Sequence, residues 1–309
     1  MIRPYREDDF WDLASLIERA LEEYPAWSFL PGAPTNHPRG FRIWEAGDEI
    51  AGFLFLLGEE YKVLGGLYLE PGRRQELDSM LNEAFQPLFG DPENLALTAC
   101  AEMGGFSLVP ALSSLGFDLV ERLELVQERE KTFFRKPSLP SDYRLIPWEP
   151  RFFDAAVALL EKSNRGTLEG LFLCFPSLAT LENCRKLLQG ILEGDFGPFL
   201  SDATGLLFDD ADHLVGLSLM VQSNEGEALL YEIALERGYQ GKGLAPCLIA
   251  HLQEASWKRG LDRIRFDYCG GNRAVRWLFG QDEVQVGRKE EILVWRSPRY
   301  RAMRKNPPI

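Results

Sequence analysis

Short apolar patterns of two kinds follow one another along the chain, and they predict strands and helices in alternation. The segment 261–268 predicts a strand with one buried face, because every second residue is apolar. The segment 244–260 predicts a helix, because its apolar residues recur three or four positions apart and a glycine ends it. Alternation of this kind indicates an α/β fold. We expect its sheet to be mixed, with parallel and antiparallel strands, which gives the fold α+β character.

The two halves of the chain show similar patterns in the same order. Residues 2–10 and 145–153 each predict a short strand, a turn and the start of a helix. Further along, Gly52 and Gly216 each follow a polar turn and precede an apolar strand, as in a hairpin. The order predicts an internal duplication. Individual residues match poorly, so a chance similarity between two α/β domains stays open.

A linker is predicted at 135–142, which contains two prolines and two serines. It divides the chain into predicted domains 1–135 and 142–298. The second half carries an additional stretch, around 163–199, between its opening motif and its hairpin. We expect this stretch to form either a lid or acceptor-side wall, or a helical pair that packs on the sheet.

Charge and composition narrow the classes of partner. The chain has 309 residues, with 47 acidic and 34 basic side chains and a formal net charge of −13. An acidic protein repels phosphate backbones, so we expect no nucleic-acid partner and favour amine or cationic ligands. The five cysteines and three histidines lack the spacing of a zinc site, so no metal is expected. Apolar stretches are too short to span a bilayer and no signal core opens the chain, which predicts a cytoplasmic protein without a membrane partner.

The segment 231–248 predicts a strand, a glycine-rich turn and a helix. Gly238, Gly241 and Gly243 allow a ligand to approach the backbone closely, and Lys242 adds a positive charge. Free N–H groups at a helix N-terminus form an anion site. The alternative is an ordinary strand–turn–helix joint. The glycine spacing fits neither a P-loop nor the dinucleotide-binding fingerprint.

This turn resembles the Gln/Arg-x-x-Gly-x-Gly/Ala loop of GNAT-type N-acetyltransferases, which holds the pyrophosphate of CoA. The matching residues are Gln240, Gly241, Lys242, Gly243, Leu244 and Ala245. Asn272, at the predicted start of the next helix, is similar to an Asn of that family that contacts the cofactor. The resemblance covers 143–296 well and 1–130 in outline.

The resemblance implies two tandem GNAT-like acyl-CoA N-acyltransferase domains, arranged as in mycothiol-synthase-like enzymes, with acetyl-CoA as cosubstrate. The loop and Asn272 would then bind the CoA moiety. The backbone of Ile233, Ala234 and Leu235 would hydrogen-bond the acetyl carbonyl and the pantetheine arm.

Transfer to an amine requires a proton acceptor and a donor to the leaving thiolate. Glu232, just before the loop, is the candidate base, with Asp267 as second choice. The alternative for Glu232 is an exposed residue or a structural ion pair. Where the family often has a Tyr donor this chain has Phe279, so Tyr268 is the candidate general acid; Cys269 or unassisted departure of the thiolate are alternatives.

The first half lacks the loop. At the corresponding place, 69–77 contains only Gly72, followed by a bulky and charged run with Arg73 and Arg74. We expect those two residues either to bind an anion or, more simply, to be a solvated helix start. The first domain is therefore interpreted as a degenerate GNAT-like domain that supports the second or shapes its acceptor pocket.

These observations predict an N-acetyltransferase that moves an acetyl group from acetyl-CoA to a primary amine by direct attack in the second domain. The acceptor would be a small-molecule amine or a peptide N-terminus, and the protein a monomer or homodimer. The alternative, from another class, is a non-catalytic acyl-CoA-binding or regulatory protein.

Overall fold

The computed structural model forms two compact units. It describes residues 1–27, 30–47, 49–131, 137–172, 178–272, 275, 278 and 284–303. Phe279 and the first two residues of the predicted linker, Arg135 and Lys136, lie outside these residues. The first unit contains residues 1–120 and 291–309, and the second contains residues 121–290. No helix among the described residues is long and apolar enough to cross a membrane.

The first unit is a mixed sheet with helices on both faces. Its strands are β1 (Ile2–Pro4), β2 (Phe41–Ala46), β3 (Glu49–Leu57), β4 (Tyr61–Leu69) and β5 (Ala96–Cys100), joined by the last part of β14 (Val284–Arg296). Its helices are α1 (Phe10–Glu23), α2 (Ala33–Asn36), α3 (Leu77–Phe89), α4 (Val109–Ser114) and α10 (Pro298–Met303). A small hairpin, β6 (Glu102–Met103) and β7 (Phe106–Ser107), follows β5.

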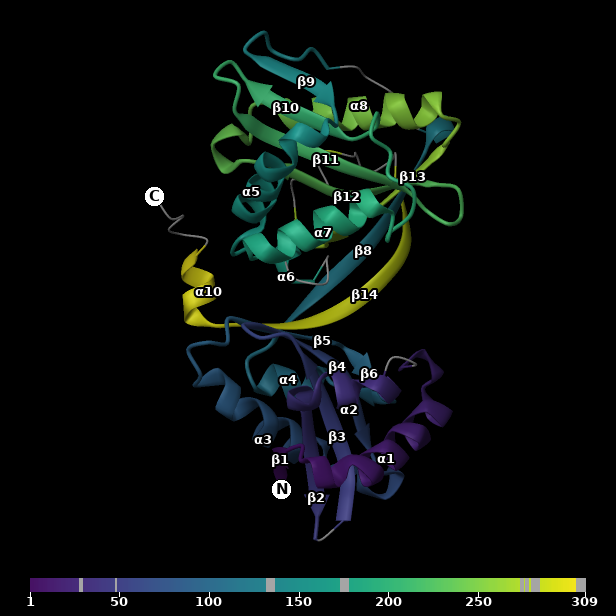
Figure 1. Cartoon of the computed structure of the whole chain (residues 1–309), viewed down its shortest axis with the longest axis vertical. Helices are drawn as coiled ribbons and strands as arrows, with labels where there is room; N and C mark the ends of the chain where they lie inside the picture. The colour runs from purple at the N-terminus through teal and green to yellow at the C-terminus, as the bar shows by residue number, and fades with distance from the viewer. Residues whose placement is uncertain are drawn as a thin grey trace. The chain divides into compact units, whose positions relative to one another are not determined.

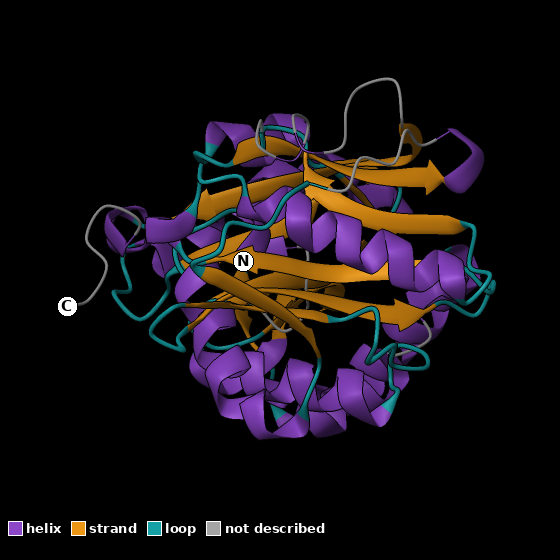
Figure 2. Ribbon diagram, turned by 90° about the horizontal axis from the view of Figure 1, so that it is seen from above, coloured by secondary structure: helices purple, strands orange, loops and turns teal. Residues whose placement is uncertain are grey.

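The second unit repeats this plan. Its sheet has the order β9 (Tyr143–Pro147), β10 (Gly205–Asp209), β11 (Leu214–Gln222), β12 (Ala228–Leu235), β13 (Arg263–Cys269) and β8 (Asp118–Glu128). Its helices are α5 (Phe153–Asn164), α6 (Glu169–Phe172), α7 (Leu181–Glu193) and α8 (Leu244–Lys258). Figure 1 labels these elements, and Figure 2 distinguishes the helices from the strands by colour.

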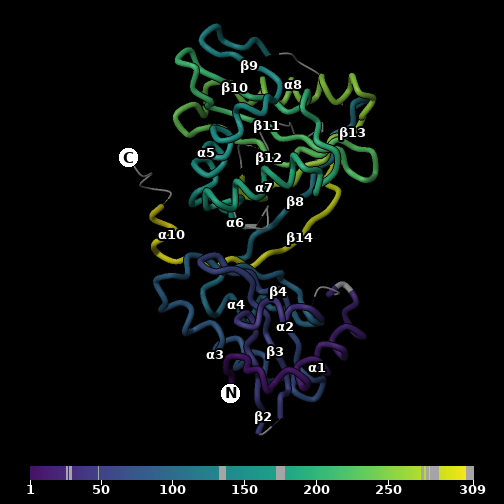
Figure 3. The backbone as a smooth tube through the Cα atoms, viewed as in Figure 1, coloured from purple at the N-terminus to yellow at the C-terminus, as the bar shows by residue number. Residues whose placement is uncertain are grey.

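Each unit includes a strand from the opposite half of the chain. Residues Arg122–Glu128 of β8 pair antiparallel with β13, and residues Ile292–Arg296 of β14 pair antiparallel with β5. Figure 3 traces both strands along the chain. The compact units are therefore not contiguous in sequence. The predicted boundaries 1–135 and 142–298 describe the repeat along the chain and stay a prediction.

The repeated hairpins have the same register. Gly52 of β3 pairs with Leu69, and Gly216 of β11 pairs with Leu235. A β-bulge interrupts the ladder at the same distance from each glycine, with Gly65 as the extra residue in β4 and Tyr231 in β12. This agreement, position by position, supports two tandem domains of the same fold.

Helices cover both faces of the sheet in the second unit. Two clusters of buried apolar residues show which helices pack on each face. One cluster joins α5 and α7 to the sheet, with Leu160, Leu188 and Leu219 fully buried in it. A second cluster joins α8 to the other face, with Leu252 and Phe266 among its members. Apolar residues at helical spacing in α8 and on alternate positions of β13 produce this packing, as the sequence pattern predicts.

Candidate active site

The centre of the candidate site is β12 of the second unit. In the pairing of β12 with β11, Glu232 lies opposite Leu219 and Leu230 lies opposite Met220. Tyr231, between them, is the extra residue of a β-bulge. The parallel ladder with β13 covers only Ala228–Leu230. Beyond Leu230 the two strands diverge, and bulges of this kind commonly re-aim side chains and end strand pairing beside functional sites.

Glu232 lies in this region on the side of α5 and α6. Its carboxylate accepts hydrogen bonds from the side chain of Asn164, at the end of α5, and from the backbone N–H of Ile233. Burial, reinforced by the negative charge of Glu169 on α6, raises the pKa of Glu232 to about 8. The two hydrogen bonds favour the ionised form and only partly offset this rise. A carboxylate with this proton affinity is matched to taking up a proton near neutral pH.

A tight turn after α5 holds Asn164 and Glu169 in place. The Thr167 hydroxyl donates to the Asn164 carbonyl over 2.8 Å and accepts from the N–H of Gly170 over 3.0 Å. A Cβ on Gly170 would lie 2.5 Å from the Asn164 carbonyl oxygen, so a larger residue would displace the turn. Close packing at Gly170 therefore fixes the two polar side chains beside β12.

Asn272 reaches the same place from the turn after β13. Its Nδ2 donates to Oε1 of Glu169 over 2.7 Å, and its Oδ1 accepts from the N–H of Val275 over 3.3 Å. Its own N–H donates to the carbonyl of Cys269 over 2.8 Å. The amide thus caps the following segment and points its donor toward α6. Glu169 brings together two residues that the sequence had named separately, Glu232 and Asn272.

The glycine-rich turn follows β12 after a short 3-10 helix, Arg237–Tyr239. Gly241 and Gly243 both have φ of +76°, and a Cβ on either would meet no atom within 4 Å. Gly243 is the N-cap of α8 and has no side-chain cap. The first N–H groups of α8, those of Leu244 and Ala245, therefore lie at an open and glycine-lined approach, which suits an anion.

Side chains at the loop are held by the neighbouring strand ends. Gln240 donates from Nε2 to the Leu235 carbonyl over 3.0 Å. The Lys242 ammonium lies 4.7 Å from the centre of the Tyr239 ring, and the Tyr239 hydroxyl donates to Asp209 over 2.6 Å. Lys242 itself is exposed. A cation is therefore available where the loop opens to solvent.

The structure does not bring Tyr268 to Glu232. Tyr268 is 5% exposed and packs in the cluster that joins α8 to the sheet, whereas Glu232 lies on the face covered by α5. Its role as proton donor stays a prediction.

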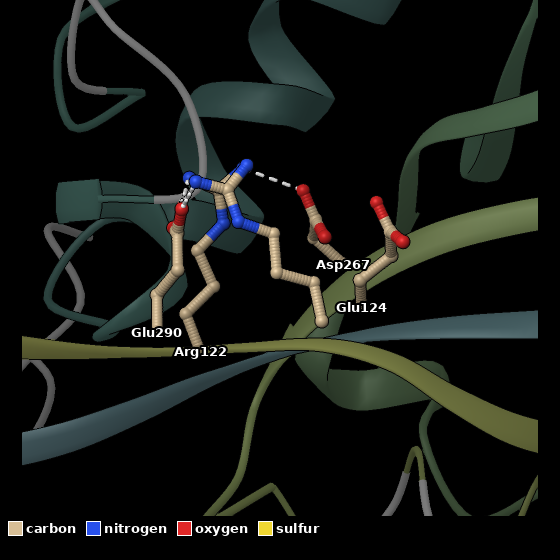
Figure 4. A pocket seen from close by; sticks show the side chains of 5 residues that line it. Arg122, Glu124, Asp267 and Glu290 are labelled. Carbon is tan, nitrogen blue, oxygen red and sulfur yellow. Dashed lines mark hydrogen bonds and ion pairs between the residues drawn. The ribbon is translucent and has the colours of Figure 1, made fainter.

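Asp267, the second choice for the base, belongs to a charged group on the sheet. Its carboxylate pairs with Arg122 of β8, as Figure 4 shows, and Arg122 also reaches Glu290 at 3.4 Å. Glu124 and Arg288 complete the lining of this shallow pocket. Among the described residues, no cluster of His, Cys, Asp and Glu could hold a metal ion.

Known structures share this architecture over nearly the whole chain. Neither family models nor curated proteins match the sequence. The GCN5-related N-acetyltransferase from Sphaerobacter thermophilus superposes with a TM-score of 0.55 at 15% identity, over 96% of this chain and 95% of that chain. The chain has the GNAT fold. The enzyme of the same description from Kribbella flavida gives a TM-score of 0.55 at 11% identity, over 95% of this chain and 70% of that one. The GCN5-related N-acetyltransferase from Anabaena variabilis ATCC 29413 gives a TM-score of 0.54 at 9% identity, over 95% of this chain and 72% of that chain.

At these identities the likeness establishes the GNAT fold, and the reaction has to be argued from the site. The narrower likeness to mycothiol-synthase-like enzymes finds no support among these structures. The prediction that the chain has the GNAT fold, an α/β fold with a mixed sheet, is confirmed.

The first GNAT unit differs from the second at each of these points. The register position of Glu232 is held by Gly66, which pairs with Phe55 just past the bulge as Glu232 pairs with Leu219. The turn after β4 is a helical segment, Pro71–Glu76, rather than an open glycine loop. Its Arg73 bonds to Glu76 over 2.9 Å.

The first unit also packs its own backbone against the diverging strand. Gly104, in the β6–β7 hairpin, lies so close to β4 that a Cβ there would be 2.4 Å from the Leu67 carbonyl oxygen. Leu67 has the register position that Ile233 has in the second unit. The hairpin therefore fills the first unit at the place where the second unit carries the predicted pantetheine-binding backbone.

Two residues of the site were missed by the sequence reading, Asn164 and Glu169. Both lie at the start of the additional stretch 163–199, which was expected to form either an acceptor-side wall or a helical pair. An Asn and a Glu near a helix end are common, so no local signal distinguished them. Only the contact of α6 with the turn after β13 reveals their position.

Proposed function

We propose that the second unit is an N-acetyltransferase that moves the acetyl group of acetyl-CoA to a primary amine. The observation that carries the proposal is Glu232. Its carboxylate lies on β12 beyond the end of the ladder with β13, and burial raises its pKa to about 8. The same strand leads through the short helical turn Arg237–Tyr239 into the glycine loop. A base of matched proton affinity beside an anion-binding loop is the arrangement that acyl transfer from CoA needs.

The loop fits the pyrophosphate of CoA. Gly241 and Gly243 leave their backbone open, and the N–H groups of Leu244 and Ala245 begin α8. Gln240 and Lys242 would add side-chain contacts. We assign Ile233, Ala234 and Leu235 to the acetyl carbonyl and pantetheine arm, because their strand has left the ladder with β13. Asn272 would contact the cofactor from the opposite side.

In the reaction, Glu232 takes a proton from the bound ammonium, directly or through water, and frees the nitrogen lone pair. The amine nitrogen then bonds to the thioester carbonyl carbon while backbone N–H groups of β12 stabilise the developing oxyanion. The C–S bond breaks and the nitrogen loses its second proton to solvent. The thiolate takes up one proton and leaves as the free thiol, and Glu232 returns the proton that it accepted to solvent, so that one proton is released in each turnover. We retain Tyr268 as the proposed donor to the thiolate, with water as the alternative.

Calorimetric titration of acetyl-CoA tests the cofactor assignment. It compares two variants that carry the same Gly→Asp substitution at different positions. Gly243→Asp places a carboxylate at the loop, so we expect acetyl-CoA binding to be lost through bulk and charge. Gly226→Asp is the matched control, because Gly226 has φ of +77° and an equally open Cβ position in the turn before β12. Equal affinity of the two variants would contradict the loop assignment.

The alternative is an acyl-CoA-binding protein without transfer. The burial of Tyr268 on the α8 face favours it, because this position separates the proposed proton donor from Glu232. A thiol-release assay over a panel of primary amines separates the two functions. Turnover with any amine supports the transferase, and binding without turnover supports the alternative.

A further inference from the structure

Helix α6 links the two sides of the site. Its first residue, Glu169, accepts a hydrogen bond from Asn272 over 2.7 Å, on the side assigned to the cofactor. The same carboxylate acts by its charge on Glu232, on the side assigned to the acceptor. The turn locked by Thr167 and Gly170 holds Glu169 between them.

We infer that Glu169 is a positioning residue that orients the Asn272 amide and places a negative charge beside Glu232, which strengthens the Glu232 carboxylate as the acceptor of the amine proton. The inference rests on the proposed function. Two nearby carboxylates do not ionise independently, because each negative charge disfavours the other. Glu169 also accepts a hydrogen bond from the Asn272 amide, which holds its carboxylate in place.

Other titratable groups around Glu232 do not replace Glu169 in this role. Cys184 of α7 lies within electrostatic reach of Glu232, and burial raises the pKa of its thiol to about 12, so it stays neutral. Glu161 of α5 also acts on Cys184, and it forms an ion pair with Arg165. Glu169 is thus the like charge that acts on Glu232 from an element outside its own strand.

The test compares pH profiles of kcat/KM for thiol release in the full chain. Glu169→Gln keeps an oxygen acceptor for Asn272 and removes the charge, so we expect the midpoint of the acidic limb to move to lower pH. The rate at pH 6 then rises by about three- to tenfold relative to the plateau, while the acetyl-CoA dissociation constant stays within about twofold.

Two further variants separate charge from shape. Glu169→Asp restores the charge, and we expect the midpoint to return toward that of the wild type. Glu182→Gln removes a charge from the exposed side of α7, where Glu182 pairs with Lys186, and should leave the profile unchanged. Together they distinguish the effect of Glu169 from a general loss of negative charge.

One result would overturn this inference and leave the proposed function intact. The wild-type profile of kcat/KM would show an acidic limb, and the midpoint of that limb would be the same in Glu169→Gln. Equal shifts in Glu169→Gln and Glu182→Gln would overturn it as well. A wild-type enzyme without any acidic limb would instead refute the role of Glu232, and with it the basis of the inference.

Discussion

Replacement of Glu232 by Gln should make the protein more stable while it removes the transfer activity. Gln has nearly the same shape, and its amide oxygen can still accept the hydrogen bond from Asn164. The change removes the ionisable group whose pKa rises from 4.5 to about 8 on folding. A half-buried base whose charged form is poorly solvated destabilises the fold that holds it.

The sign and the size of the effect follow from proton binding. Between pH 4.5 and about 8 the folded protein keeps a proton on Glu232 that the unfolded chain has released, so stability falls as the pH rises through this window. At about 1.4 kcal/mol for each pH unit, the upper limit is about 5 kcal/mol above pH 8. Relaxation and water entry lower the cost of burying a charge, and we expect roughly 1–3 kcal/mol.

Scanning calorimetry at pH 5, 7 and 9 measures this difference. A unit of this size shifts its Tm by about 2–4 °C for each kcal/mol. The Tm of Glu232→Gln should exceed that of the wild type most at pH 9 and hardly at all at pH 5. Glu193→Gln, at an exposed position on α7, is the control and should change the Tm little at any pH. A Glu232→Gln variant that is equally or less stable at pH 9 would refute the environment assigned to Glu232.

Three further predictions concern the rest of the molecule. Titration should give one acetyl-CoA per chain, since the β6–β7 hairpin packs against Leu67 in the first unit; a stoichiometry of two would contradict this. Gln127→Leu should cost about 1–3 kcal/mol in chemical denaturation, because it leaves the buried Gln253 amide without the partner that it reaches over 2.7 Å. The double variant with Gln253→Leu should recover most of that loss, and no recovery would contradict the reasoning. Tyr268→Phe tests the proposed proton donor: a rate loss of about 10²-fold or more supports the role, and an unchanged rate leaves protonation of the thiolate to water.

Local patterns in the sequence predicted much of the fold. The periodicity of α8 and the alternation in β13 have a direct physical cause in one-sided burial, and the paired glycines Gly52 and Gly216 identified equivalent hairpins. The Gln240–Ala245 loop and Glu232 could be named as candidates because loop chemistry and strand position are both local in sequence.

The features that were missed depend on long-range pairing. Nothing in β8 itself indicates that it pairs with β13 rather than with a strand of its own half, because the alternation of apolar residues along a strand does not encode the identity of its partner. The bulge at Tyr231 and the packing of Gly104 are likewise set by the opposing strand. Glu169 was missed because its role depends on Asn272, which is 103 positions away in the chain.

The pH dependence of acetyl transfer tests the central claim most directly. The acceptor should be an amine whose own pKa lies well above 9, so that it binds as an ammonium throughout and only the enzyme titrates between pH 7 and pH 9. With a pKa of about 8 for Glu232, we predict that kcat/KM for thiol release rises about tenfold from pH 7 to pH 9 in the wild type. In Glu232→Gln we predict a rate at least about 10²-fold lower with no such rise. A wild-type profile that is flat over this range, or a Glu232→Gln variant that keeps both rate and profile, would contradict the account.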